Sequence, residues 1–254
     1  MRKQQELKIN DKIVELVTVG REYLQKNQKK YFKSFTKIAI SAGQNPENHV
    51  CDWINTADYA VIIREKDGLR EVGFIVYCFL GRSTIHIPVA MVIPSYQNGG
   101  IISKIIKKII KEFILFRVIR FFIDPIGTIS PIYIFFRTQN PSLYLSLYNN
   151  KRIKLYPNPN FDIIPNKIIE IASKYSQKLW PYASLDKRKF ILNNAYNKHP
   201  FLALNYQNIN WSGNSLVDNF FKERLSLNTS GKSKNALVVV GEIKTLFLFK
   251  FFKT

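Results

Sequence analysis

One segment constrains the fold of this chain more than any other, because an apolar strand there runs into a tight turn and then into a periodic helix. The apolar run covers residues 84–93, the turn contains Gly99 and Gly100, and the helix begins at about Ile101. Such a junction leaves backbone N–H groups without partners at the positive end of the helix dipole. These groups bind phosphate without the help of a charged side chain. The junction therefore predicts a phosphorylated cofactor.

Two common nucleotide-binding patterns do not fit the junction. A Walker-type loop requires Lys and then Ser or Thr directly after its last glycine, whereas Ile101 and Ile102 follow Gly100. A dinucleotide fingerprint requires three spaced glycines, and the turn supplies only Gly99 and Gly100. The predicted phosphate loop therefore belongs to neither class.

Residues 97–106 resemble the pyrophosphate loop of the GNAT superfamily of acyl-CoA N-acyltransferases. The family pattern Gln/Arg-x-x-Gly-x-Gly/Ala is filled here by Gln97, Gly100 and Ile102. Ile102 departs from the pattern, because Gly or Ala at that position lets the helix approach the cofactor closely. The resemblance implies an acyl-CoA co-substrate, an amine acceptor and no metal.

A second segment extends the resemblance to roughly residues 50 to 157. Residues 132–136 predict a buried strand, Asn140 and Pro141 predict a turn, and residues 142–148 predict a short helix. The family has the same order of strand, phosphate loop, long helix, strand, Asn and short Tyr-bearing helix. By resemblance, the helix tyrosine that protonates the departing thiolate is Tyr148 or Tyr144, since the spacing from Asn140 leaves both open.

His86 lies eleven residues before Gln97, on the strand that leads to the loop. Some family members carry a catalytic Glu at that offset, where it acts as general base toward the amine. Histidine has a pKa suited to the same task. The alternative interpretation is a strand histidine satisfied by a neighbouring backbone group.

The resemblance also implies where the cofactor binds. The pantetheine arm would pair with strand backbone near Met91, Val92 and Ile93, and a backbone N–H near Val92 would stabilise the oxyanion. The residues expected to contact the rest of the cofactor are Gln97, Asn98, Gly99, Gly100, Ile101, Ile102 and Asn140.

The expected fold is of the α/β (α+β) class. It has a GNAT-like mixed, mostly antiparallel central sheet, with splayed central strands and flanking helices. We expect residues 1–157 to form the acyl-CoA-binding core with N-terminal helices. Residues 158–254 would form a C-terminal extension that includes a last core strand at 236–243.

Local patterns predict the individual elements. The stretches expected to be helical are 11–42, 101–116 with a stripe of Ile102, Ile105, Ile109, Phe113 and Phe116, 166–178, and 190–196. The expected strands are 60–63, 72–80 and the His86 strand, with a hairpin turn at 66–68. Residues 246–252 form a very apolar run that fits an edge strand, an interfacial contact or a partner site.

Composition narrows the class of protein. The chain has 254 residues, 46% of them hydrophobic, and only two cysteines, which excludes a disulfide framework. No signal peptide or spanning segment is recognisable, so the expected location is the cytoplasm.

The net charge of +20 attracts nucleic acid or anionic membranes non-specifically, but no nucleic-acid motif is present. Two alternatives to the enzyme stay open. One is a GNAT-shaped binding or scaffold protein without catalysis, and the other is a basic protein that binds nucleic acid or a membrane surface. The acceptor, the acyl chain length and the oligomeric state are not specified by the sequence.

Overall fold

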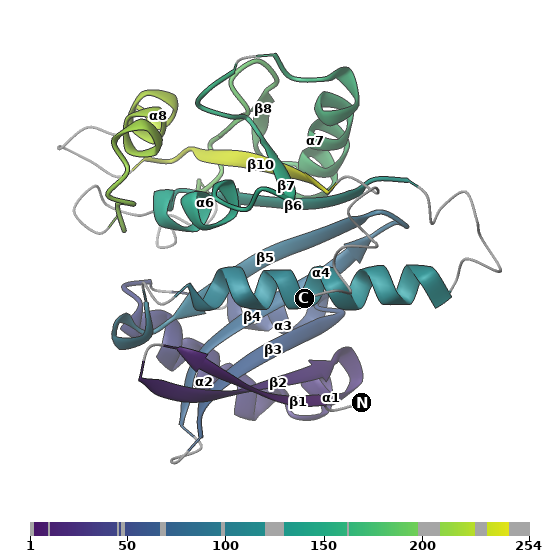
Figure 1. The fold of residues 1–254 in the computed structure, drawn as a ribbon, viewed down its shortest axis with the longest axis vertical. Helices are drawn as coiled ribbons and strands as arrows, with labels where there is room; N and C mark the ends of the chain where they lie inside the picture. The colour runs from purple at the N-terminus through teal and green to yellow at the C-terminus, as the bar shows by residue number, and fades with distance from the viewer. Residues whose placement is uncertain are drawn as a thin grey trace. The chain divides into compact units, whose positions relative to one another are not determined.

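The computed structural model (Figure 1) describes residues 3–9, 11–44, 46, 49–66, 70–97, 100–119, 130–161, 163–197, 209–226 and 233–243. The chain divides into two units. Unit 1 consists of Met1–Leu80 and Ile85–Ile109, and unit 2 consists of Gly81–Thr84 and Ile110–Thr254. The boundary predicted after residue 157 lies inside unit 2.

Unit 1 contains five strands in the order β1-β2-β3-β4-β5. Their bounds are Lys3–Ile9, Lys12–Gly20, Tyr59–Glu65, Glu71–Leu80 and Thr84–Val92. The first three pairings are antiparallel, and a register shift between Ile63 and Arg64 marks an irregularity in β3. The strands predicted around residues 60–63, 72–80 and His86 are therefore present. Of the predicted 66–68 turn, Asp67 and Gly68 lie outside the described residues.

The prediction of a helix over residues 11–42 is wrong for residues 12–20. Residues 12–20 form β2, which pairs with β1 on one side and with β3 on the other. The run from Ile13 to Val19 is rich in β-branched side chains, which pack well on a pleated surface and lose freedom in a helix. Helix formation starts only at Arg21, with α1 (Arg21–Lys26) and α2 (Gln28–Ser41).

Helices cover the sheet of unit 1. In Figure 1, α2 and α3 (His49–Thr56) lie behind the strands, and the part of α4 (Ile101–Ile119) that belongs to unit 1 lies in front of them. The rings of Phe35 on α2 and Phe74 on β4 stack with centroids 3.9 Å apart, and Trp53 on α3 lies 6.1 Å from Phe74. This aromatic cluster fixes α2 and α3 against β4.

Helix α4 begins at the predicted residue but buries a broader face than the predicted stripe. Ile105, Ile109 and Phe113 are buried as expected, whereas Phe116 is 44% exposed. The buried face also includes Ile101, Ile106, Ile110 and Ile114. The stripe thus drifts around the helix, because residues three and four apart are nearly but not fully in line.

Unit 2 is built around β10 (Ala236–Ile243), the strand predicted at 236–243. The strand order is β6-β10-β9-β8, and β7 also pairs with β10. The bounds are Ile132–Thr138 for β6, Ile153–Tyr156 for β7, Ser184–Asp186 for β8 and Ile191–Asn193 for β9. The helices are α6 (Pro141–Tyr148), α7 (Asn166–Leu179) and α8 (Ser215–Leu225). All of these strand pairings are antiparallel, which confirms the mostly antiparallel mixed fold.

The helix predicted at 190–196 is wrong, because residues 191–193 form β9 between β8 and β10. Phe190 and Asn194 flank this short strand with φ values of 57° and 58°. These left-handed conformations do not fit a right-handed helix. The apolar run at 246–252 lies outside the described residues.

A glycine at position 73 permits the close approach of two strands in unit 1. A Cβ atom there would lie 2.8 Å from the Met91 carbonyl oxygen and 2.7 Å from Ile63 Cδ1. Because the carbonyl is backbone, it has no rotamer by which to escape. We expect Gly73→Ala to lower the free energy of unfolding by about 1–3 kcal/mol, measured by urea denaturation.

Gly20→Ala is the matched control for this substitution. Its Cβ would meet only Tyr59 ring atoms, at 3.8 Å, and its φ of −87° suits any residue. We expect its free energy of unfolding to change by less than about 1 kcal/mol. An equal loss in both variants would contradict the crowding at Gly73.

Candidate functional site

The strand β5 ends where the predicted phosphate loop begins. Pro94 cannot donate to a strand ladder, and residues Pro94–Tyr96 form a single 3-10 turn, η1. The N–H of Ile93 donates to the carbonyl oxygen of Val72 at 2.9 Å, which holds the end of β5 against β4. The turn thus leaves the sheet from a fixed point.

Successive residues of a strand direct their backbone groups to opposite edges. Since the Ile93 N–H points to β4, the backbone groups of Val92 point to the other edge of β5. The Val92 carbonyl accepts a hydrogen bond from Gln97 Nε2 at 2.9 Å. The Gln97 side chain therefore ties the turn back to the strand, a role that the sequence pattern did not indicate.

Gly100 opens α4 in a left-handed conformation, with φ +66°. A Cβ atom added there would meet no atom within 4 Å, so backbone conformation and not space favours glycine. Lys104 N donates to the Gly100 carbonyl at 3.0 Å, which starts the helical hydrogen bonds. Gly100, Ile101 and Ile102 thus lie at the helix start, where the sequence predicted the phosphate contacts.

The predicted set of phosphate donors is smaller in the structure. The Gln97 N–H already donates to the Pro94 carbonyl at 3.1 Å. Asn98 and Gly99 lie outside the described residues. The described main-chain amides that remain candidates are those of Gly100, Ile101 and Ile102.

Polar side chains surround the turn on unit 1. Tyr96 donates its hydroxyl to Glu65 Oε1 at 2.9 Å, and Lys12 Nζ lies 4.3 Å from the centre of the Tyr96 ring. Lys104, one turn into α4, is exposed and donates to the Lys8 carbonyl at 3.2 Å. Two lysines and the Glu65 carboxylate therefore lie at this end of unit 1.

His86 lies on β5 and is 4% exposed. Burial of this kind fits the structural interpretation of His86 more closely than that of a general base open to an incoming amine.

Asn140 and Pro141 form the start of α6 in unit 2. Asn140 Oδ1 accepts from the Leu143 N–H at 3.1 Å, and its own N–H donates to Thr138 Oγ1 at 2.9 Å. Pro141 occupies the first helical position, where no N–H is needed. The Asn140 side chain thus acts as the N-cap of the tyrosine-bearing helix.

The two candidate tyrosines of α6 have different environments. Tyr144 is fully buried, and its hydroxyl donates to the Pro157 carbonyl oxygen at 2.6 Å. Desolvation raises the pKa of Tyr144 well above its usual value, and the neighbouring Tyr148 contributes to the increase in this pKa. Tyr148 is only partly buried, and its hydroxyl accepts a hydrogen bond from the exposed Asn160 side chain. Of the two, Tyr148 is the more accessible acid.

No cluster of His, Cys, Asp or Glu suited to a metal ion occurs among the described residues. Within the same residues, no helix is both long and apolar enough to cross a membrane. Cys51 and Cys78 are free thiols.

No family model matches the chain, and no curated protein matches its sequence. In structure, the chain is similar to an IAA acetyltransferase from Bacillus cereus ATCC 14579, with 11% identity and a TM-score of 0.46, over 91% of this chain and 99% of that one. It is also similar to a GNAT family acetyltransferase from Bacillus anthracis, with 15% identity and a TM-score of 0.32, over 58% and 81% of the two chains. An aminoglycoside 6′-acetyltransferase type Ii is similar at 15% identity and a TM-score of 0.32, over 62% of this chain and 88% of that one. The Bacillus anthracis protein is a member of the family that the sequence resembles.

The two tyrosines should differ in their contribution to stability. Tyr144→Phe leaves the buried Pro157 carbonyl without its donor, so we expect the free energy of unfolding to fall by about 1–3 kcal/mol. Tyr148→Phe removes a bond to an exposed side chain, and we expect a change within about 0.5 kcal/mol. Urea denaturation followed by circular dichroism measures both, and a larger loss for Tyr148→Phe would show that the structural role is assigned to the wrong residue.

Proposed function

We propose that the chain is an acyl-CoA-dependent N-acyltransferase that moves an acyl group, most simply acetyl, from the coenzyme A thioester to an amine. The observation that carries the proposal is the junction of β5, the Gly100 turn and the start of α4. A left-handed glycine there opens a 19-residue helix beside exposed lysine side chains. A helix start of this kind suits a diphosphate.

In this proposal, the diphosphate of the cofactor binds the main-chain amides of Gly100, Ile101 and Ile102. Asn98 and Gly99 would complete the loop, and Lys104 would add a positive charge. The Gln97 side chain would act indirectly, since its hydrogen bond to the Val92 carbonyl supports the turn. Asn140 would act as the N-cap that orients α6.

The reaction is an attack of a neutral amine nitrogen on the thioester carbonyl carbon. The C–N bond forms, a tetrahedral oxyanion develops, and the C–S bond then breaks. The Val92 N–H is the proposed oxyanion donor, because it points to the edge of β5 away from β4. The amine proton goes to bulk water or to His86, and burial of His86 favours water. Met91 and Ile93 would contribute to binding of the pantetheine arm. The Ile93 N–H would take no part, because it already donates a hydrogen bond to the Val72 carbonyl oxygen.

Tyr148 is the proposed proton donor to the thiolate, with Tyr144 as its buried support. The two rings stack with centroids 5.9 Å apart. A hydroxyl that is buried, bonded to a carbonyl and raised in pKa is a poor acid, which argues against Tyr144. Tyr148 lacks that internal carbonyl bond among the described contacts.

Ile102 favours a second candidate, a GNAT-shaped binding protein without catalysis. Its branched side chain is partly buried at a position where the family pattern has Gly or Ala. Such a side chain keeps the helix start farther from a diphosphate. This candidate predicts that neither acetyl-CoA nor a longer acyl-CoA stabilises the protein.

We expect Tyr148→Phe to slow acyl transfer by about 10²-fold, the usual contribution of one proton-transfer group. Thiol release from acetyl-CoA, assayed with a panel of small amines and lysine-containing peptides, measures the rate. Tyr144→Phe is the control, with turnover per folded molecule close to that of the unmodified chain. Unchanged turnover in both variants would remove the tyrosines from the mechanism.

We expect Gly100→Ala to lose the stabilisation that acetyl-CoA provides. In the unmodified chain this stabilisation is about 2.7 kcal/mol when the acetyl-CoA concentration is 100 times its Kd. Strain of about 1–2 kcal/mol in the left-handed conformation should move the helix-start amides. Gly43→Ala is the matched control, because Gly43 also has a positive φ of +79° and no atom within 4 Å of an added Cβ. Thermal melts with and without acetyl-CoA measure both, and retained stabilisation in Gly100→Ala would contradict the loop assignment.

A further inference from the structure

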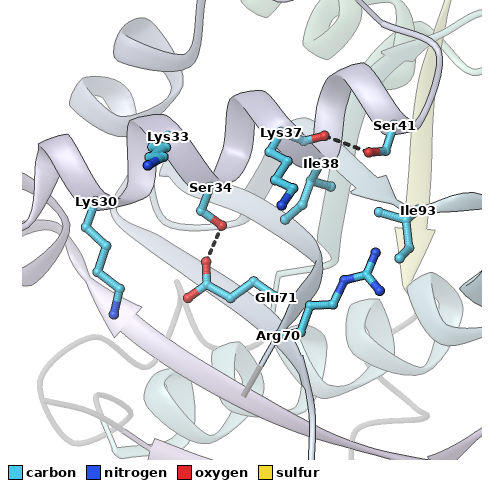
Figure 2. A pocket seen from close by; sticks show the side chains of 9 residues that line it. All are labelled: Lys30, Lys33, Ser34, Lys37, Ile38, Ser41, Arg70, Glu71 and Ile93. Carbon is cyan, nitrogen blue, oxygen red and sulfur yellow. Dashed lines mark hydrogen bonds between the residues drawn. The ribbon is translucent and has the colours of Figure 1, made fainter. Parts of the chain in front are cut away.

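A pocket of about 290 Å³ lies in unit 1, between α2 and the ends of β4 and β5. Figure 2 shows Lys30, Ser34 and Lys37 along α2, with Glu71 and Arg70 on the opposite side. The volume lies near the lower limit of ~300–1,000 Å³ for small-molecule sites, so the pocket suits a compact ligand. The lining residues are Lys30, Lys33, Ser34, Lys37, Ile38, Ser41, Arg70, Glu71 and Ile93.

The charge of this lining is strongly positive. Lys30, Lys33, Lys37 and Arg70 contribute four cations, and none of them forms a salt bridge with another described residue. The three lysines recur at three- and four-residue steps on α2, so they extend along one side of the helix. Cations placed this way repel one another, and a multiply charged anion between them would relieve the repulsion.

The single carboxylate of the lining is already engaged. Glu71 Oε1 lies 3.0 Å from Arg64 Nη2, with side-chain exposures of 11% and 8%, and its other oxygen accepts from the Ser34 hydroxyl. Arg64 therefore balances the Glu71 charge. The exposed cations are left to act on a ligand.

None of the helix-start amides proposed to hold the cofactor diphosphate lines this pocket, and Ile93 is the one residue that it shares with the proposed cofactor site. Helix α2 covers the face of the unit 1 sheet that is opposite to α4 (Figure 1). Ile38 and Ile93 form a buried apolar floor, which gives room for the carbon part of a ligand. Arg70, near Ile93 in Figure 2, offers a planar set of donors that suits phosphate oxygens.

From these observations we propose that the pocket binds a small phosphorylated molecule other than the acyl-CoA cofactor. The lysines of α2 and Arg70 bind the phosphate oxygens, and Glu71 with Ser34 shapes the wall between them. The proposal does not depend on acyl transfer, because binding is its only claim.

Isothermal titration with inorganic pyrophosphate at low ionic strength tests the pocket, with saturating coenzyme A present to occupy the helix-start loop. We expect one site per chain. We expect the double variant Lys33→Gln/Lys37→Gln to bind about tenfold more weakly, since each exposed charge pair contributes a modest amount. Arg70→Gln, on the opposite wall, should weaken binding in the same direction.

Lys26→Gln/Lys29→Gln is the matched control. Both residues are exposed on α1 and α2 outside the pocket, and the double variant removes the same charge. We expect its affinity to stay within about twofold, because solvent screens distant charges. Thermal melts establish that all variants fold.

Two results would overturn the proposal. One is an equal loss of affinity in the pocket and control variants, which indicates non-specific attraction by the net charge. The other is a loss of affinity for coenzyme A in Lys33→Gln/Lys37→Gln without a loss of affinity for 3′-dephospho-coenzyme A. Because the two ligands differ only in the 3′-phosphate, this result assigns the pocket to that phosphate of the cofactor. If the chain binds no coenzyme A at all, the same titration without it still tests the pocket while the acyltransferase proposal fails.

Discussion

The hydrogen bond from the Ile93 N–H to the Val72 carbonyl fixes the point from which the rest of the candidate site is built. It holds the end of β5 on β4, so that Pro94 turns the chain out of the sheet at a defined residue. Gln97 then bonds back to Val92, and Gly100 takes the left-handed conformation that starts α4. The absence of a side chain at Gly73 allows this approach, since Met91 and Ile63 occupy the space of a Cβ. The turn and the helix start therefore depend on the close approach of β4 and β5.

Features that depend on local chemistry could be predicted from the sequence. The start of α4 at Ile101 and the short helix after Asn140 follow from glycine, proline and N-cap preferences that act within a few residues. The strand at 236–243 follows from an unbroken apolar run. The mostly antiparallel fold then follows from the order of these elements.

Features that depend on distant partners could not be predicted. Residues 12–20 form a strand because β1 and β3 flank them, and the apolar pattern alone also fits a helix. The strand at 191–193 exists because β10 offers it an edge, and two left-handed residues bound it. At the candidate site, the amide of Gln97 and the hydroxyl of Tyr144 are engaged by carbonyls that only the folded backbone brings near. The sequence likewise does not show that Arg70 and Glu71 lie opposite the lysines of α2, because only the fold brings these residues together.

The sheet of unit 1 also determines how charges on its two faces interact. Its strands carry buried apolar side chains such as Val61, Ile75 and Ile85, which form a layer of low dielectric constant between α2 and the start of α4. Charges at the start of α4 and charges on α2 are each screened by the salt in the adjacent solvent, over a Debye length of roughly 8–10 Å. A change of charge on one face, by occupancy or by mutation, therefore affects the other face more strongly at low ionic strength than at high ionic strength.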